Sequence, residues 1–369
     1  MAEAKPPYRS EHVGSFPRPE RLMKAREDFV AKKIAKDTLR AIETECIREI
    51  VARQERVGIG AVTDGEFRKV GWRDFVYEKT EGLSAERAPP SFKFTLYDGT
   101  VRQAGGSPAI AGKLRRRESW SADDFALLKP MTGRPIKANL PTPSSFHFQA
   151  GDAAIAKAAY KDRDALLADV NRIFRDEIVD LARAGCTYLQ LDEVPLAVIC
   201  DPNNMEIVRR RGEDPDELID DYVDAINDSI HDRPANMTVA VHMCRGNVGH
   251  GMADGGYEPV ADRMFNRLKV DGFFLEYDTP RSGDFRPLRF MPKGKIAVLG
   301  LVSTKLPEVE SADSLKRRID EAAKYVALDQ LALSPQCGFS SSASHDRLPP
   351  GVVEAKLARI VEVAHQVWG

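Results

Sequence analysis

The chain has 369 residues, of which 43% are hydrophobic and 30% charged, a balance typical of a soluble globular protein. Its 54 basic and 56 acidic residues leave a formal charge of -2, which gives no electrostatic argument for binding nucleic acid or an anionic membrane. No apolar run approaches the roughly 18 residues of a membrane span, and the N-terminus lacks the apolar core of a signal peptide. Five cysteines, an odd number in a long chain, do not indicate a disulfide framework. We therefore expect a cytoplasmic protein with free thiols.

Eight short apolar runs that end in polar residues predict β-strands. In chain order they cover residues 11–15, 61–66, 135–140, 187–193, 239–244, 272–278, 295–305 and 331–337. Helices are predicted between them by 3.6-residue spacing, most clearly at 37–57, 164–184, 214–230, 312–327 and 352–367. Asp214-Pro215 and Ser311 are good helix starts, because each supplies a capping oxygen and the first adds a proline at the first helical position. Strands that alternate with helices predict an α/β fold, and eight such units favour a closed (β/α)8 TIM barrel.

One segment, residues 85–120, does not fit this alternation. It is rich in Pro, Gly and Arg around a strand-like FKFTLYDGT, and predicts a hairpin excursion inserted after the second strand. The remainder fits a single catalytic barrel domain over residues 1–369. No GxGxxG or GxxxxGK[ST] motif follows a predicted strand, which removes the main reason to prefer an open doubly wound sheet.

Residues that commonly bind metals stand at the ends of three predicted strands. His242 and Cys244 close VAVHMC two residues apart, so they point to the same side of their strand. Glu276 closes FFLE, and Cys337 closes LALSPQC. The C-terminal ends of barrel strands converge on one face, where these four side chains could meet as a nitrogen, sulfur and oxygen set suited to Zn²⁺. A lone cysteine is more often a small buried apolar residue, which is our interpretation of Cys46, Cys186 and Cys200.

These residues resemble the catalytic, C-terminal barrel of cobalamin-independent methionine synthase, and in particular the short stand-alone members of that family. The motifs HVGSFPRP, TDGEFR, LQLDE, HMCRGN, LEYD and SPQCGF occur in the family's order over nearly the whole chain. The resemblance implies that Ser15 touches the carboxylate of an amino-acid substrate, and that Glu66 and Asp192 hold its ammonium group. It also implies four zinc ligands: His242, Cys244, Glu276 and Cys337.

The chain departs from the family pattern at two places. The synthases carry a catalytic histidine in the loop after the seventh strand, where this chain has Lys305, which could bind an anion or, if desolvated, donate a proton. The family's GPVT-type turn after the third strand, near the folate, reads LPTPSSFHF here, so that His147 and Phe148 could face a methyl donor. The candidate proton donors are therefore Lys305, His147 and a water held by Asp192.

The resemblance implies a zinc-dependent methyltransferase that alkylates a thiol, with homocysteine as acceptor, methionine as product and a methyltetrahydrofolate-type or other methyl donor. An epoxide–thiol transferase of the coenzyme M type remains an alternative, because several arginines could suit a sulfonate: Arg18, Arg68, Arg281 and Arg286. Two alternatives of another class remain, a uroporphyrinogen-decarboxylase-like lyase and a non-catalytic barrel with a structural zinc. The expected partners are small molecules, with no nucleic acid or membrane and a possible homo-oligomer.

Overall fold

The computed structural model describes residues 5–88, 91–96, 98–103, 106–247, 251–340 and 348–369. A parallel sheet of six strands lies at its centre, in the order β10-β9-β8-β7-β6-β5. The strands are β5 (Ala138–Pro141), β6 (Tyr188–Glu193), β7 (Thr238–Met243), β8 (Gly272–Glu276), β9 (Ile296–Val302) and β10 (Leu331–Pro335). The α/β class and the last six of the eight predicted strands are confirmed.

The first two predicted strands are short extended segments that join the two edges of this sheet. Ser10 forms a parallel bridge with Leu333 of β10, and Val62 forms one with Ile136, just before β5. Between the two segments, Gly60 N donates a hydrogen bond of 3.1 Å to Ser10 O. Backbone hydrogen bonds therefore run around all eight segments, as a barrel requires.

The five predicted helices are all present, with ends that shift by at most a few residues. They are α2 (Lys36–Val57), α5 (Arg163–Ala184), α8 (Pro215–Ser229), α9 (Ala312–Ala322) and α10 (Val352–Trp368). Asp214 and Ser311 cap their helices as predicted, each accepting a hydrogen bond from a backbone N–H of the first turn. The chain after α9 turns away at Ala323, so the predicted end at 327 was too late.

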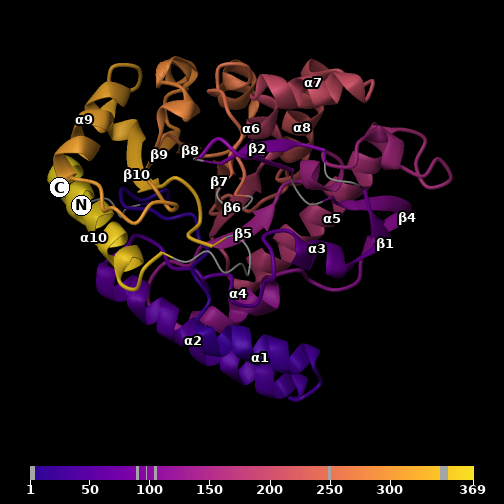
Figure 1. Ribbon diagram of the computed structural model, residues 1–369, viewed down its shortest axis with the longest axis horizontal. Helices are drawn as coiled ribbons and strands as arrows, with labels where there is room; N and C mark the ends of the chain where they lie inside the picture. Colours follow the sequence, from indigo (N-terminus) through magenta and orange to yellow (C-terminus); the bar gives the residue numbers. More distant parts are fainter. Residues whose placement is uncertain (1–4, 89–90, 97, 104–105, 248–250, 341–347) are drawn as a thin grey trace.

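Further helices complete the layer around the sheet. They are α1 (Glu20–Val30), α3 (Asp74–Glu78), α4 (Ala122–Leu128), α6 (Pro195–Ile199) and α7 (Pro202–Arg210). The chain also forms short 3₁₀ turns at Lys129–Met131, Pro143–Phe146, Asp152–Ala154, Pro280–Ser282, Arg286–Phe290 and Leu328–Gln330, and a π-helical turn at Arg263–Arg267. Figure 1 shows α1 and α2 side by side along one edge, and α9 and α10 beside β9 and β10. Among the described residues, no helix combines the length and the apolar run that a membrane crossing needs.

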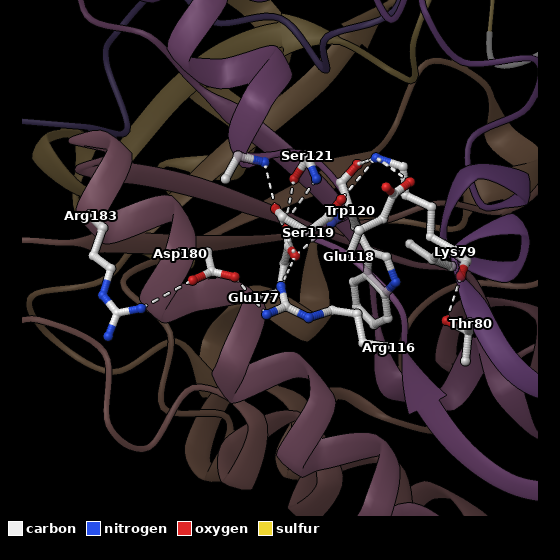
Figure 2. Close-up of polar contacts among 12 residues, drawn as sticks. Lys79, Thr80, Arg116, Glu118, Ser119, Trp120, Ser121, Glu177, Asp180 and Arg183 are labelled. Carbon is white, nitrogen blue, oxygen red and sulfur yellow. Dashed lines mark hydrogen bonds and ion pairs between the residues drawn. The ribbon is translucent and has the colours of Figure 1, made fainter.

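The predicted insertion after the second segment contains two antiparallel pairs of strands, and the longer pair lies at the opposite side of the molecule from α10 (Figure 1). Strand β1 (Thr80–Arg87) pairs with β4 (Pro108–Arg116), and β2 (Lys93–Thr95) pairs with β3 (Val101–Gln103). Figure 2 shows how the end of the insertion is fastened to α5. The buried carboxylate of Glu177 accepts hydrogen bonds from the backbone N–H groups of Trp120 and Ser121, at 2.7 and 2.8 Å, and pairs with Arg116. Because these bonds fix the chain that leaves β4, they also fix where α4 begins.

The barrel interior contains an apolar cluster and, beside it, a buried ion pair. Small and aromatic residues fill the interior layer, including Tyr188, Ala240 and Phe274. A fully buried ion pair lies beside this layer, with Lys137 Nζ 3.2 Å from Glu11 Oε2. The ammonium also lies over the ring of Phe274, and Tyr188 Oη donates a hydrogen bond of 2.7 Å to Glu11 Oε1.

This ion pair gives a prediction about stability. Lys137→Met should lower the free energy of unfolding by about 3–5 kcal/mol, because it leaves the Glu11 carboxylate buried without its partner. Urea denaturation measures the loss, and adding Glu11→Gln should recover part of it. Lys24→Met, which removes the exposed pair with Asp28, is the control and should cost less than about 1 kcal/mol. Equal costs for the two lysine variants would show that the interior pair is not ionic.

Candidate metal centre

Four side chains from three strand ends meet on one face of the barrel. His242 and Cys244 come from the end of β7, Glu276 ends β8, and Cys337 lies two residues after β10. One potential ligand atom from each lies within 4.8 Å of all the others, and the two sulfur atoms are 3.5 Å apart. All four residues are buried. The arrangement could hold a metal ion.

The chemistry of these residues fits a cation. Both ring nitrogens of His242 are buried and make no hydrogen bond with any described residue. Burial raises the pKa of the Glu276 carboxyl to about 8, and the neighbouring Cys337 adds to the shift. Buried acidic groups without a countercharge are costly, and a bound cation removes that cost. Two sulfurs, an imidazole and a carboxylate form a ligand set typical of zinc.

Hydrogen bonds from neighbouring residues hold the Glu276 carboxylate in place. Arg245 N donates to Glu276 Oε1 at 3.1 Å, and Gln336 Nε2 donates to Oε2 at 3.4 Å. Tyr257 Oη ties the two strand ends together, because it donates to Met243 O at 3.1 Å and accepts from Glu276 N at 2.8 Å. The carboxylate therefore has a fixed direction, as ligands of a metal usually have.

The residues predicted to bind an amino acid lie next to this centre. Asp192 of β6 stands in register with His242 of β7, and Gln190 Nε2 donates to its Oδ1 at 2.7 Å. Burial raises the pKa of Asp192 above its usual value, although the positive charge of His242 opposes the shift. Ser15 lies beside the residue that follows Cys337: a Cβ on Gly338 would lie 2.0 Å from Ser15 Oγ. Only glycine leaves room for this hydroxyl.

Glu66 occupies an unusual backbone position beside Asp192. Its φ is +61°, in the left-handed region that non-glycine residues rarely adopt, and it follows Gly65 at φ +69°. Burial raises the pKa of the Glu66 carboxyl to about 7, while nearby Lys69 opposes the shift and Asp192 adds to it. Glu66 Oε2 is buried and has no hydrogen-bond partner in the described part of the chain. A buried carboxylate on a strained backbone, with one oxygen left without a hydrogen bond, is typical of a ligand-binding position.

Lys305 lies in the loop after β9 and is buried. Its Nζ donates to Thr304 Oγ1 at 3.2 Å. Its positive charge opposes the rise that burial causes in the pKa of Glu276, and it adds to the lowering of the Cys337 pKa, of which the hydrogen bond with Cys244 is the main cause. The Ser303 hydroxyl accepts hydrogen bonds from the backbone N–H groups of Lys305 and Leu306, which shapes the loop. Lys305 therefore lies close enough to two of the four potential ligands for its charge to act on them, and its role in the reaction stays a prediction.

His147 lies elsewhere. Its Nδ1 is 2.7 Å from Tyr222 Oη of α8, and its Nε2 is 2.9 Å from Asp152 Oδ1. With Asp152 and Glu213 it forms a second group of close potential ligands, but Arg163 and Arg211 pair with these two carboxylates. Both ring nitrogens are engaged outside the centre, so these contacts give no support to the predicted role of His147 as proton donor. The cause is the 3₁₀ turn at Pro143–Phe146, which directs the chain toward α8.

Several side chains near the site were not predicted from the sequence. Gln190 could have been found, because it lies two residues before Asp192 on one strand and so shares its face. Gln336 precedes Cys337 directly, and Lys69 follows Glu66 by three residues. Neither position carries a sequence pattern that indicates contact with the site.

The chain is similar in sequence and in structure to several known proteins. The family model for the catalytic domain of cobalamin-independent synthase matches residues 9–366. The uncharacterized protein YxjG of Bacillus subtilis is 37% identical over 372 residues, covering 100% of this chain and 97% of the relative. The methionine synthase of Pyrococcus abyssi is 26% identical, covering 89% of this chain and 85% of the relative. A crystal structure from Listeria monocytogenes, of a protein proposed to be a vitamin-B12-independent methionine synthase, is 31% identical, with a TM-score of 0.76 and 98% of each chain covered.

Proposed function

Because the chain belongs to the cobalamin-independent methionine synthase family, we propose that it is a zinc-dependent methyltransferase that converts homocysteine to methionine. The observation that carries the proposal is the proximity of two features: a potential metal centre of two cysteines, a histidine and a glutamate, and the buried carboxylates of Asp192 and Glu66 beside it. A substrate thiol would bind at the metal centre, and the ammonium group of an amino acid would bind the acidic residues. The methyl donor would be a methyltetrahydrofolate-type compound.

In this proposal His242, Cys244, Glu276 and Cys337 hold the zinc. When bound, zinc supplies a Lewis acid that keeps a substrate thiol deprotonated at neutral pH. The chain's own residues would place the thiol. Glu66 and Asp192 accept hydrogen bonds from the ammonium group of homocysteine, and Ser15 donates to its carboxylate.

The transfer itself requires a proton as well as a nucleophile. The homocysteine sulfur forms a bond to the methyl carbon while the bond from that carbon to the donor nitrogen breaks. The leaving nitrogen must be protonated, since an amide-like anion leaves poorly. Lys305 is the preferred candidate, because it is buried and its charge acts on both Glu276 and Cys337.

The alternatives find less support in the contacts. Each arginine considered for a sulfonate already has protein partners: Arg18 donates to Glu66 O and Lys69 O, while Arg68, Arg281 and Arg286 pair with Asp124, Asp254 and Asp284. A uroporphyrinogen-decarboxylase-like lyase has no use for the metal-binding set. A purely structural zinc would keep its coordination when a thiol is added, which X-ray absorption spectroscopy can test.

A direct test of the proposal compares acceptors. Metal-loaded protein should methylate homocysteine with methyltetrahydrofolate and should not alkylate coenzyme M, with products identified by mass spectrometry. Asp192→Asn should weaken homocysteine binding by about 2–5 kcal/mol, because it removes a desolvated charge partner of the ammonium. The same variant should barely change the binding of coenzyme M, which has no ammonium. Equal losses for both thiols would remove the amino-acid assignment of the pocket.

A further inference from the structure

Lys69 is a buried cation that the reaction described above does not use. It is 5% exposed, and its Nζ lies 3.9 Å from Glu66 Oε1 and 4.3 Å from the ring centre of Phe75. The ammonium donates a hydrogen bond of 3.1 Å to Asn139 O, which is its one hydrogen bond with the residues that the structure describes. Since an ammonium has three N–H donors, it retains capacity for another acceptor.

The surroundings of Lys69 are acidic. Its charge opposes the effect of burial on the pKa of three carboxyl groups, those of Asp64, Glu66 and Asp192. Glu66 Oε2 stands close to this cation without a hydrogen-bond partner of its own in the described chain. Glu66 therefore offers an acceptor without a partner next to the Lys69 ammonium, which has donors to spare. A ligand that carries only an ammonium group would bond to the Glu66 carboxylate alone. A zwitterionic ligand would bond to the Glu66 carboxylate and to the Lys69 ammonium.

We propose that Lys69 is a specificity-determining residue that binds the carboxylate of an α-amino acid, so that the pocket prefers zwitterionic thiols to thiols carrying an ammonium alone. The inference rests on the proposed function and names the class of acceptor. The carboxylate would lie between the Lys69 ammonium and the Ser15 hydroxyl, and the substrate ammonium would lie against Glu66 and Asp192. The backbone supports this arrangement, because Phe16 N donates to Gly65 O at 3.1 Å and so joins the loop of Ser15 to that of Glu66.

The test measures the affinity of metal-loaded protein for three thiols by calorimetry. They are homocysteine, its decarboxylated analogue γ-aminopropanethiol, and its deaminated analogue γ-mercaptobutyrate. In Lys69→Met, homocysteine and γ-mercaptobutyrate should bind at least about 30-fold more weakly, through loss of a buried charge partner. γ-Aminopropanethiol should bind equally well or more tightly, because a like charge has been removed.

Controls separate this role from packing. Lys69→Arg keeps the charge and should retain most of the preference. Lys113→Met removes another lysine that lies over an aromatic ring, at 3.9 Å from the ring centre of Tyr160, and should change none of the three affinities. Lys69→Gln, which can still donate to Asn139 O, replaces Lys69→Met if that variant does not fold by circular dichroism.

The possible results test the role of Lys69 separately from the proposed methyltransferase function. Equal weakening of all three thiols, or none, in the Lys69 variants overturns the inference while leaving the proposed function in place. Failure of the unaltered, metal-loaded protein to bind any of the three thiols overturns the proposed function itself. A sulfonated thiol that binds the unaltered protein more tightly than homocysteine would also contradict the inference, because the site would then select a different anion.

Discussion

Replacing Cys244 or Cys337 by serine is expected to reduce bound zinc from about one ion per chain to almost none and to abolish methyl transfer. Each sulfur is one of four potential ligands within 4.8 Å of one another, and serine is a poor ligand for zinc. The fold should persist, because both cysteines lie at or beyond strand ends and not in the main apolar core. Elemental analysis measures the zinc, and circular dichroism checks the fold.

The same chain offers a matched control for this experiment. Cys200 is equally buried, but its Sγ donates a hydrogen bond of 3.3 Å to Leu196 O on its own helical turn. A serine hydroxyl can make the same bond, so Cys200→Ser should retain its zinc and its activity. Zinc that remains in both the Cys244→Ser and Cys337→Ser proteins would disprove the ligand assignment.

The elements that were predicted correctly are determined by residues close to one another in the sequence. The helices α2, α5, α8, α9 and α10 follow apolar spacing within the segment itself, and Asp214-Pro215 marks a start that depends on neighbouring atoms alone. His242 and Cys244 could be predicted to lie together because residues two apart on a strand point to the same side. The meeting with Glu276 and Cys337 needs one further assumption, that the strand ends converge in a barrel.

The parts that were missed depend on positions that no local pattern fixes. The first two predicted strands form single bridges at Ser10 and Val62, and the chain turns after them at Gly14, with φ +135°, and at Gly65. A run of apolar residues does not reveal these angles. That His147 faces a methyl donor stays a prediction, since a 3₁₀ turn and a tyrosine on α8 set its position and neither can be read from the local sequence. Lys69 joins the pocket because its loop folds back on Glu66 and the strand of Asn139, which are contacts between separate segments.

Lys305→Arg is expected to lower kcat by roughly 10²–10⁴ while leaving thiol binding intact, because arginine keeps the charge but cannot give up a proton in this pH range. The expectation follows from the position of Lys305, which is 6% exposed and whose charge acts on both Glu276 and Cys337. An ammonium in that place is shielded from bulk water, and we expect it to reach the leaving nitrogen. Single-turnover kinetics with bound homocysteine would isolate the chemical step.

Two other results would assign Lys305 a different role. A Lys305→Arg enzyme that keeps its kcat and changes mainly in KM would make Lys305 a binding residue for an anionic substrate. Unchanged kinetics in both Lys305→Arg and Lys305→Ala would leave it no role in the reaction. Lys295→Arg is the matched control, because Lys295 precedes the same strand at its opposite end, where its Nζ bonds to the backbone oxygens of Phe265 and Leu268. That variant should retain the kcat of the unaltered enzyme, since its charge lies a full strand length away from the metal centre.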